Sequence, residues 1–114
     1  MEQLIERVWE YSQKNPDGFT LNLETLRPVK FGISVAYLET QDSHGIESLE
    51  RVINHALQHG KIVGGWLNVE NGKFYFDSVK IFKNEDQIFA KAFGKNQKQI
   101  AIFDLTNLEE IKIK

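Results

Sequence analysis

Apolar and polar positions alternate most clearly in residues 63–82, VGGWLNVENGKFYFDSVKIF. Two runs rich in aromatic and β-branched residues flank Asn71-Gly72. This dipeptide favours a type I′ hairpin turn, because both central positions of that turn need positive φ. A two-residue turn would pair Glu70 with Lys73 and, four pairs further along, Trp66 with Asp77. In this register one face of the predicted hairpin is apolar and carries Leu67, Val69, Phe74 and Phe76.

The alternation changes beyond Asp77, because Val79 and Ile81 place apolar side chains on the face that is polar nearer the turn. Gly64 and Gly65 lie opposite this change. A glycine pair inside a strand is typical of a β-bulge or of a close approach by another backbone. These two alternatives stay open, together with a strand that is buried on both faces from this point on.

Two longer segments have apolar residues at helical spacing, residues 2–14 and residues 44–59. We expect Asp42 or Ser43 to cap the start of the second helix, and Gly60 to follow its end as the left-handed residue.

A third, shorter helix is predicted after Asn84 and Gln87, which have the spacing of a capping box. We expect it to stop at Gly94. Its inward-facing residues would be Ile88, Phe89, Ala92 and Phe93.

Further strands are predicted at residues 19–23, 32–40, 99–105 and 109–114, with a loop at residues 26–30. The first two would form a wide hairpin. The order is then α-β-β-α-β-β-α-β-β without a sequence repeat or a linker. We therefore predict a single α+β domain over residues 1–114, built as a mainly antiparallel twisted sheet with about three helices.

The composition excludes several classes of site. The chain has no cysteine, so disulfides, thiolate catalysis and cysteine-ligated metals are excluded. The first residues, MEQLIERVWEYSQ, have no basic region followed by an apolar run, so they predict neither a signal peptide nor a membrane span. The expected compartment is the cytoplasm.

The charge argues against a nucleic-acid partner. The net charge is −2, and the basic residues after position 60 are all lysines. Bidentate arginine contacts to phosphate or guanine are thus missing where the positive charge lies. We expect scattered lysines on a solvated surface, namely Lys80, Lys83, Lys91, Lys95 and Lys98.

The longest polar run, Glu39–Gly45, is the main candidate for a catalytic site. It leads into a predicted helix, whose first N–H groups can hold an anion. Asp42, Ser43 and His44 offer an acid, a hydroxyl and an imidazole. The alternative is a solvated loop that only caps the helix, since neighbours in sequence rarely converge as a triad.

Two further groups of side chains are candidate sites. His55 and His59 have the spacing of metal ligands on one helix face, but no third ligand accompanies them, and a position near the helix end explains both. We predict no metal and no cofactor. Trp66, Tyr75 and Asp77 would share one face of the hairpin, either as a binding surface together with Glu39 or as core beneath a helix.

Several segments, NPDGFTLNLETL, GISVAYLETQDSHG, HALQHGKIVGGWL, ENGKFYFDSVKIF and QIAIFDLTNLEEIKI, resemble a family of short, uncharacterised proteins of gut-type anaerobic bacteria. Genes of this family often accompany conjugative or other mobile elements. The resemblance covers nearly the whole chain. It implies an intracellular accessory protein, and it implies no reaction, cofactor or catalytic residue.

Two functions from different classes follow. The first is a small non-enzymatic binding module for a protein or a small ligand, because structural signals abound while catalytic motifs are missing. The alternative is a hydrolase or transferase that uses the Glu39–His44 loop with Asp77.

The C-terminal segment Glu109–Lys114 predicts a strand at the edge of the sheet. Ile111 and Ile113 would share one face, with Lys112 and Lys114 on the other. Exposed edges invite pairing and lysines oppose it, so the choice between a monomer and a homodimer is open. We expect the dimer, because the chain has apolar surface to cover.

Overall fold

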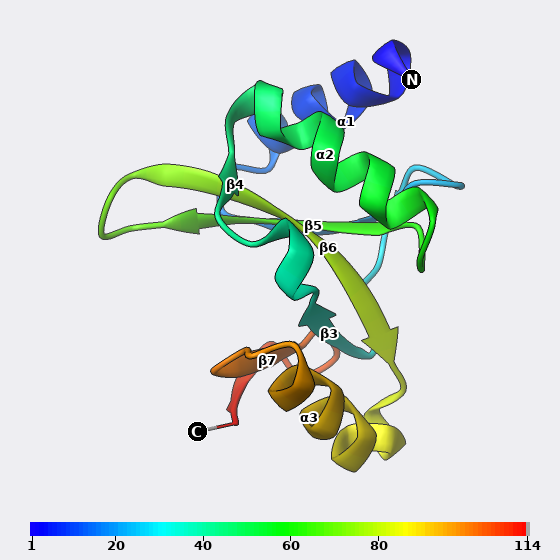
Figure 1. Ribbon diagram of the computed structural model, residues 1–114, viewed down its shortest axis with the longest axis vertical. Helices are drawn as coiled ribbons and strands as arrows, with labels where there is room; N and C mark the ends of the chain where they lie inside the picture. The colour runs from blue at the N-terminus through cyan, green and yellow to red at the C-terminus, as the bar shows by residue number, and fades with distance from the viewer. Residues whose placement is uncertain (114) are drawn as a thin grey trace.

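Strand β6 (Lys73–Phe82) is the longest strand of the structure, a computed structural model that describes residues 1–113 (Figure 1). It pairs antiparallel with β5 (Ile62–Asn68) along one side, and with β3 (Ile33–Ala36) and β4 (Ser43–His44) along the other. The sheet has eight strands, and its main path runs β2–β1–β5–β6–β3–β7–β8. The other strands are β1 (Phe19–Asn22), β2 (Arg27–Pro28), β7 (Ala101–Asp104) and β8 (Glu109–Lys112).

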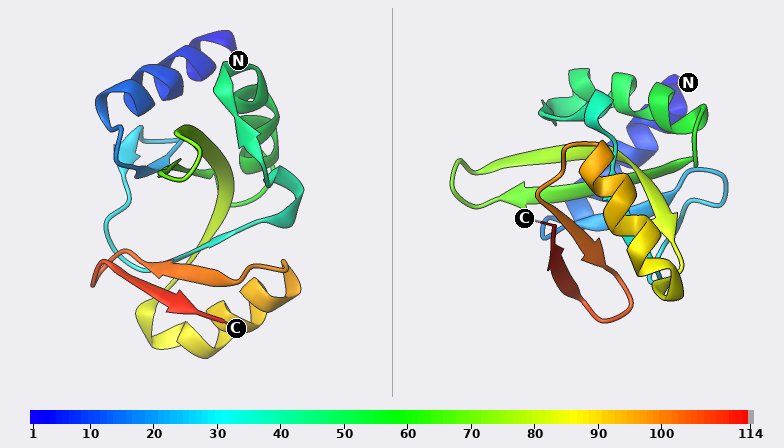
Figure 2. Two further views of the ribbon diagram at one scale, coloured as in Figure 1. Left: turned by 90° about the vertical axis from the view of Figure 1, so that its left-hand side faces the viewer. Right: turned by 60° about the horizontal axis from the view of Figure 1, so that its bottom comes forward.

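The helices pack in two groups at opposite ends of the curved sheet (Figure 2). Helices α1 (Glu2–Lys14) and α2 (Gly45–Leu57) cover one end, and α3 (Gln87–Asn96) covers the other. Phe76 and Phe82 are an even number of residues apart on β6, so they point to the same face of the sheet and enter different cores.

The first core, under α1 and α2, is built from Val8, Leu21, Leu23, Leu49, Val52, Ile53, Ala56, Val63 and Phe76. The second core, under α3, is built from Ile33, Val35, Ala90 and Ile102. The predicted class, an α+β domain with an antiparallel sheet and three helices, is confirmed. The structure adds two very short strands, β2 and β4, that were not predicted, and β2 falls within the predicted loop.

The predicted hairpin forms, but its register is wrong by two residues. Asn68 pairs with Lys73 and Trp66 with Tyr75, leaving a four-residue loop. Only Gly72 of the Asn71-Gly72 pair has positive φ, so the type I′ turn does not form. The Asn68 side chain instead accepts the backbone N–H of Glu70 at 2.9 Å.

A slip of two residues leaves every strand residue on its predicted face, because side chains alternate with a period of two. The exception is Val69, which leaves the apolar face for the loop and is 84% exposed.

Gly64 and Gly65 do not mark a bulge, because β5 and β6 pair without interruption from Ile62 to Asn68. A Cβ on Gly65 would lie 2.7 Å from a ring carbon of Phe74 and still closer to the ring of Phe19. These two rings stack across the glycine with centroids 6.0 Å apart. The close approach at the Gly65 Cβ position is therefore made by aromatic rings. Residues 62–65 are all buried, which agrees with the alternative of a strand buried on both faces.

The predicted caps of α2 are wrong. The helix begins after His44, with no side-chain capping bond, and the hydroxyl of Ser43 donates to the carbonyl of Thr40 at 2.8 Å instead. Asp42 has a φ of 63° and lies outside the capping position. After the helix, Lys61 and not Gly60 takes the left-handed conformation, and its N–H donates to the carbonyl of Ala56.

Helix α3 also differs from its prediction. No side-chain capping bond forms at its start, and Asn84 binds the carboxylate of Asp104 at 2.9 Å. The helix passes through Gly94 to Asn96, since a buried glycine there makes room for Ile102 and Ile113. The buried face differs from the predicted one: Ala90 and Gly94 are buried and Phe93 is half-buried, whereas Ala92, Ile88 and Phe89 are exposed, the last two at 82% and 67%.

The predicted wide hairpin of residues 19–23 and 32–40 is wrong. Strand β1 pairs with β5, because Leu21 and Val63 belong to the first core. Strand β3 pairs with β6 and β7, because Ile33 and Val35 belong to the second core. The predicted second strand ends at Ala36, and a 3₁₀ turn η1 (Leu38–Thr40) follows it.

Strand β8 is at the edge of the sheet, as predicted, while Lys114 lies outside the described residues. Ile111 and Ile113 pack against the second core of their own chain. A homodimer stays a prediction. No helix in residues 1–113 is long and apolar enough to cross a membrane.

The glycine pair provides a matched test of packing. Gly65→Ala should destabilise the fold by about 1–3 kcal/mol, because the added methyl group displaces the Phe19 and Phe74 rings. Gly64→Ala should change the stability little, since its Cβ would make only ordinary contacts, the nearest to Val79 at 3.4 Å. Urea denaturation measures both changes, and equal effects of the two substitutions would contradict the ring-stacking interpretation.

Candidate functional site

A groove of about 1120 Å³ lies on the sheet face away from the helices. Seven strands line it, through residues that include Thr20, Pro28, Ser34, Ala36, Gly64, Trp66, Tyr75, Asp77, Val79, Ala101, Phe103 and Glu110. Within residues 1–113 no helix covers Trp66, which is 45% exposed. For Trp66, the predicted alternative of a core position beneath a helix is therefore wrong.

An aromatic row forms one part of the groove. Trp66 and Tyr75 are cross-strand partners, and their rings stack with centroids 5.1 Å apart and planes 21° from parallel. His44, from β4 on the other side of β6, meets the Tyr75 ring edge-on at 5.5 Å. Three strands thus hold an indole, a phenol and an imidazole in fixed positions.

Asp77 lies beside this row on the same face of β6. The indole Nε1–H of Trp66 donates to its Oδ2 at 3.1 Å. Burial raises the pKa of Asp77 to about 6, the Trp66 hydrogen bond partly opposes the shift, and the nearby Asp42 carboxylate adds to it. A carboxyl with a raised pKa in a groove is a candidate functional group.

The charged side chains around the groove are mostly acidic. The lining contains Asp17, Asp42, Asp77 and Glu110 against the single cation Lys30, a difference of three charges when all are ionised. The groove is thus acidic, whereas the whole chain is close to neutral at −2.

Strand alternation separates Asp42, Ser43 and His44, the three neighbours that are candidate catalytic residues. Ser43 points to the helix side opposite Phe76, where it is fully buried and accepts a hydrogen bond from Arg51. Asp42 and His44 lie on the groove side. Because the hydroxyl faces away from the acid and the imidazole, the predicted Asp42–Ser43–His44 site does not form.

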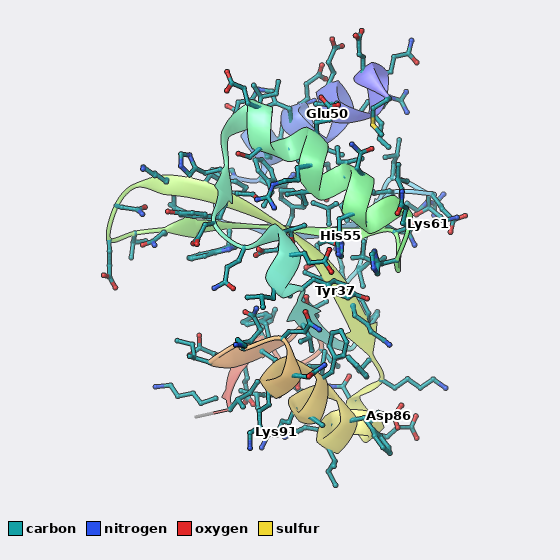
Figure 3. The ribbon with its side chains drawn as sticks, viewed as in Figure 1. Tyr37, Glu50, His55, Lys61, Asp86 and Lys91 are labelled. Atoms are coloured by element: carbon teal, nitrogen blue, oxygen red, sulfur yellow. The ribbon has the colours of Figure 1, made fainter. Side chains whose placement is uncertain are left out.

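Glu39 is also directed to the helix side, away from Trp66 and Tyr75. Its carboxylate lies 3.4 Å from Nε2 of His55, and Nδ1 of His55 lies 2.8 Å from the hydroxyl of Ser78. The ring of His59 stacks on that of His55 with centroids 3.8 Å apart. Figure 3 shows His55 on α2 with Tyr37 below it, between α2 and α3.

This serine–imidazole–carboxylate arrangement has no access to a substrate. Ser78 is fully buried, and the imidazole presents Nδ1 to it, where a catalytic triad presents Nε2. Burial and the neighbouring His59 hold the pKa of His55 below its usual range, although Glu39 acts against them. The group forms part of the junction between the two cores.

The two histidines predicted as non-ligands are thus tied to the fold. Nδ1 of His59 contacts the carbonyl of His55 at 2.6 Å, and their parallel rings do not converge on a common point. Sequence reasoning missed Ser78 and Arg51 in this cluster, because both become neighbours of the 39–43 segment only when α2 packs on β6.

Comparisons of the chain with models of known protein families, with curated protein sequences and with solved structures returned no match.

Asp77 gives a pH-dependent prediction. Its pKa near 6 exceeds the ordinary value of 3.8, so the folded state holds the proton more tightly and stability falls as the pH rises from about 4 to 6. Asp77→Asn keeps an acceptor for Trp66 and removes the charge. It should therefore raise the free energy of unfolding by roughly 1–2 kcal/mol at pH 7.5, and change it little at pH 4.

Chemical denaturation at the two pH values measures this difference. Glu50→Gln, at an exposed position on α2 (Figure 3), serves as the control. It should change the free energy of unfolding by the same amount at both pH values. If Asp77→Asn is no more stable than the original protein at pH 7.5, the charged Asp77 carboxylate does not destabilise the folded state.

Proposed function

We propose that this protein is a non-enzymatic binding module whose groove holds a basic, extended segment of a protein partner. The observation that carries this proposal is the open sheet face, where the exposed Trp66 stacks on the half-buried Tyr75 beside Asp77. Aromatic side chains that are rigidly held and partly exposed are typical anchors of protein interfaces. An accessory role in a mobile element, which the sequence resemblance implies, would suit such a module.

The size and openness of the groove support a polypeptide over a small molecule. Its volume of about 1120 Å³ exceeds the usual range of about 300–1,000 Å³ for small-molecule sites. Its lining residues also come from seven strands instead of gathering around one point. An extended segment would run over several of these strands and contact the aromatic row.

The charge of the groove supports a basic partner. Asp17, Asp42 and Glu110 attract lysine and arginine side chains, while they repel the phosphates of a nucleic acid. Electrostatic complementarity of this kind favours encounter and orientation, so binding should weaken as salt rises.

A second candidate function rests on one observation, the raised pKa of Asp77 beside Asp42. A carboxyl that titrates near pH 6 suits a general acid or base of a hydrolase or transferase. If the protein were such an enzyme, purified protein would turn over ester, peptide or phosphoester substrates, and Asp77→Asn would abolish that activity. Binding of a basic segment without turnover supports the first function.

Two labelled decapeptides test the proposed function, one of alternating lysine and valine and one of alternating glutamate and valine. We expect fluorescence anisotropy to show binding of the lysine peptide only, weakened by added salt. Trp66→Ala should reduce the affinity by roughly tenfold, since an interface anchor contributes more than about 1 kcal/mol.

Phe89→Ala is the matched control, because Phe89 is also an exposed aromatic, on α3, and does not line the groove. It should bind the lysine peptide like the original protein. Equal binding of both peptides, or equal loss in the two variants, would exclude the groove as an acidic binding surface.

A further inference from the structure

Gly64 interrupts a row of side chains that line the groove, and we call the space above its backbone the Gly64 hollow. Thr20 of β1, Gly64 of β5 and Asp77 of β6 are cross-strand neighbours on the groove face. Gly64 has no side chain, so the backbone forms the floor of the hollow between a hydroxyl and a carboxylate. A Cβ added there would make only ordinary contacts, at 3.4 Å to Val79 and 3.8 Å to the Phe19 carbonyl.

Trp66 forms the wall of this hollow. It follows Gly64 by two residues on the same strand, so its side chain projects from the same face. Its ring is fixed on one side by Tyr75 and by the hydrogen bond from Nε1 to Oδ2 of Asp77. The hollow therefore has a glycine floor, a rigid indole wall and a carboxylate at its end.

The Asp77 carboxylate has capacity for a partner. Within residues 1–113 its Oδ2 accepts the Trp66 hydrogen bond, and no hydrogen bond reaches its Oδ1. Asp42 is close enough to act on Asp77 electrostatically, and no cationic side chain does so. A cation from outside the chain would relieve the repulsion between these two carboxylates.

We propose that the Gly64 hollow is a subsite for one lysine or arginine side chain of the bound segment. The aliphatic stem lies over the Gly64 backbone against the Trp66 ring, and the cationic end pairs with Asp77 and Asp42. A cation near an indole face gains a further electrostatic attraction. This subsite rests on the proposed function, since it specifies which residue of the partner the groove selects.

The protonation of Asp77 gives the subsite a second property. The charged groups that act on it are Asp42 before β4 and the incoming cation, while Trp66 supplies a neutral donor. Below pH 6 Asp77 is largely protonated and offers the cation little attraction. Preference for a cationic side chain therefore increases between pH 5 and pH 7.5.

Two decapeptides that differ at one position test the subsite by isothermal titration calorimetry. The first peptide has alternating lysines throughout. In the second, norleucine replaces the central lysine, which keeps the aliphatic stem and removes the charge. We expect the original protein to prefer the lysine peptide by about tenfold at pH 7.5 and by less at pH 5. Asp77→Asn should remove the preference and its pH dependence.

Gly64→Val fills the hollow with a residue that suits a strand. We expect it to bind both peptides equally, at the affinity of the norleucine peptide. If Gly64→Val does not fold, as judged by circular dichroism, Gly64→Ala and Asp77→Asn decide the question with the same peptides.

The outcomes separate the two proposals. Failure of both peptides to bind the original protein overturns the proposed function and the subsite with it. Binding of both peptides with equal affinity, or a lysine preference that survives Gly64→Val and Asp77→Asn, overturns the subsite alone.

Discussion

The fold depends on one strand that belongs to two cores. Strand β6 presents Phe76 to the core under α1 and α2, and Phe82 to the core under α3. Phe74, Phe76 and Phe82 project from the same face, so the helices of both cores lie on that face. Within residues 1–113 the helices leave the opposite face uncovered, and this is where the groove forms.

The junction between the two cores is polar, because β6 places a serine there. Ser78 lies between Phe76 and Phe82 on the helix side, and its hydroxyl is paired with His55. The Tyr37 ring contacts His55 at 4.8 Å and Phe93 of α3 at 5.4 Å, so it joins the two helix groups. Buried polar groups need partners: His55 pairs with the Ser78 hydroxyl, and the Thr40 hydroxyl accepts the backbone N–H of Ser78.

The groove contains groups that the fold itself does not need. The carboxylate of Asp77 is penalised by burial and by Asp42, and Trp66 is left about half exposed. Sites that cost stability in the free protein are typical of binding and catalytic surfaces. The Ser43 and Ser78 hydroxyls are both buried on the helix side, away from these groups.

Sequence patterns predicted the faces better than the pairings. Alternation placed Trp66, Tyr75 and Asp77 together correctly even though the hairpin register was wrong, because a slip by two residues preserves the faces. The partners of β1 and β3 could not be predicted, since they depend on which core each strand joins. The roles of Asp42 and Ser43 were wrong for a similar reason: β4 is only two residues long, and its pairing with β6 decides which side chain faces the groove.

The two tryptophans offer the most direct measurement of the central claim, that the uncovered sheet face is the binding surface. Trp66 lies in the groove, whereas Trp9 packs against the core on the helix side. In a ¹H–¹⁵N correlation spectrum titrated with a lysine–valine decapeptide, we expect the Trp66 indole and Gly64 amide signals to shift while the Trp9 indole signal stays in place. Shifts confined to Trp9 and the helices, with Trp66 and Gly64 unchanged, would contradict it.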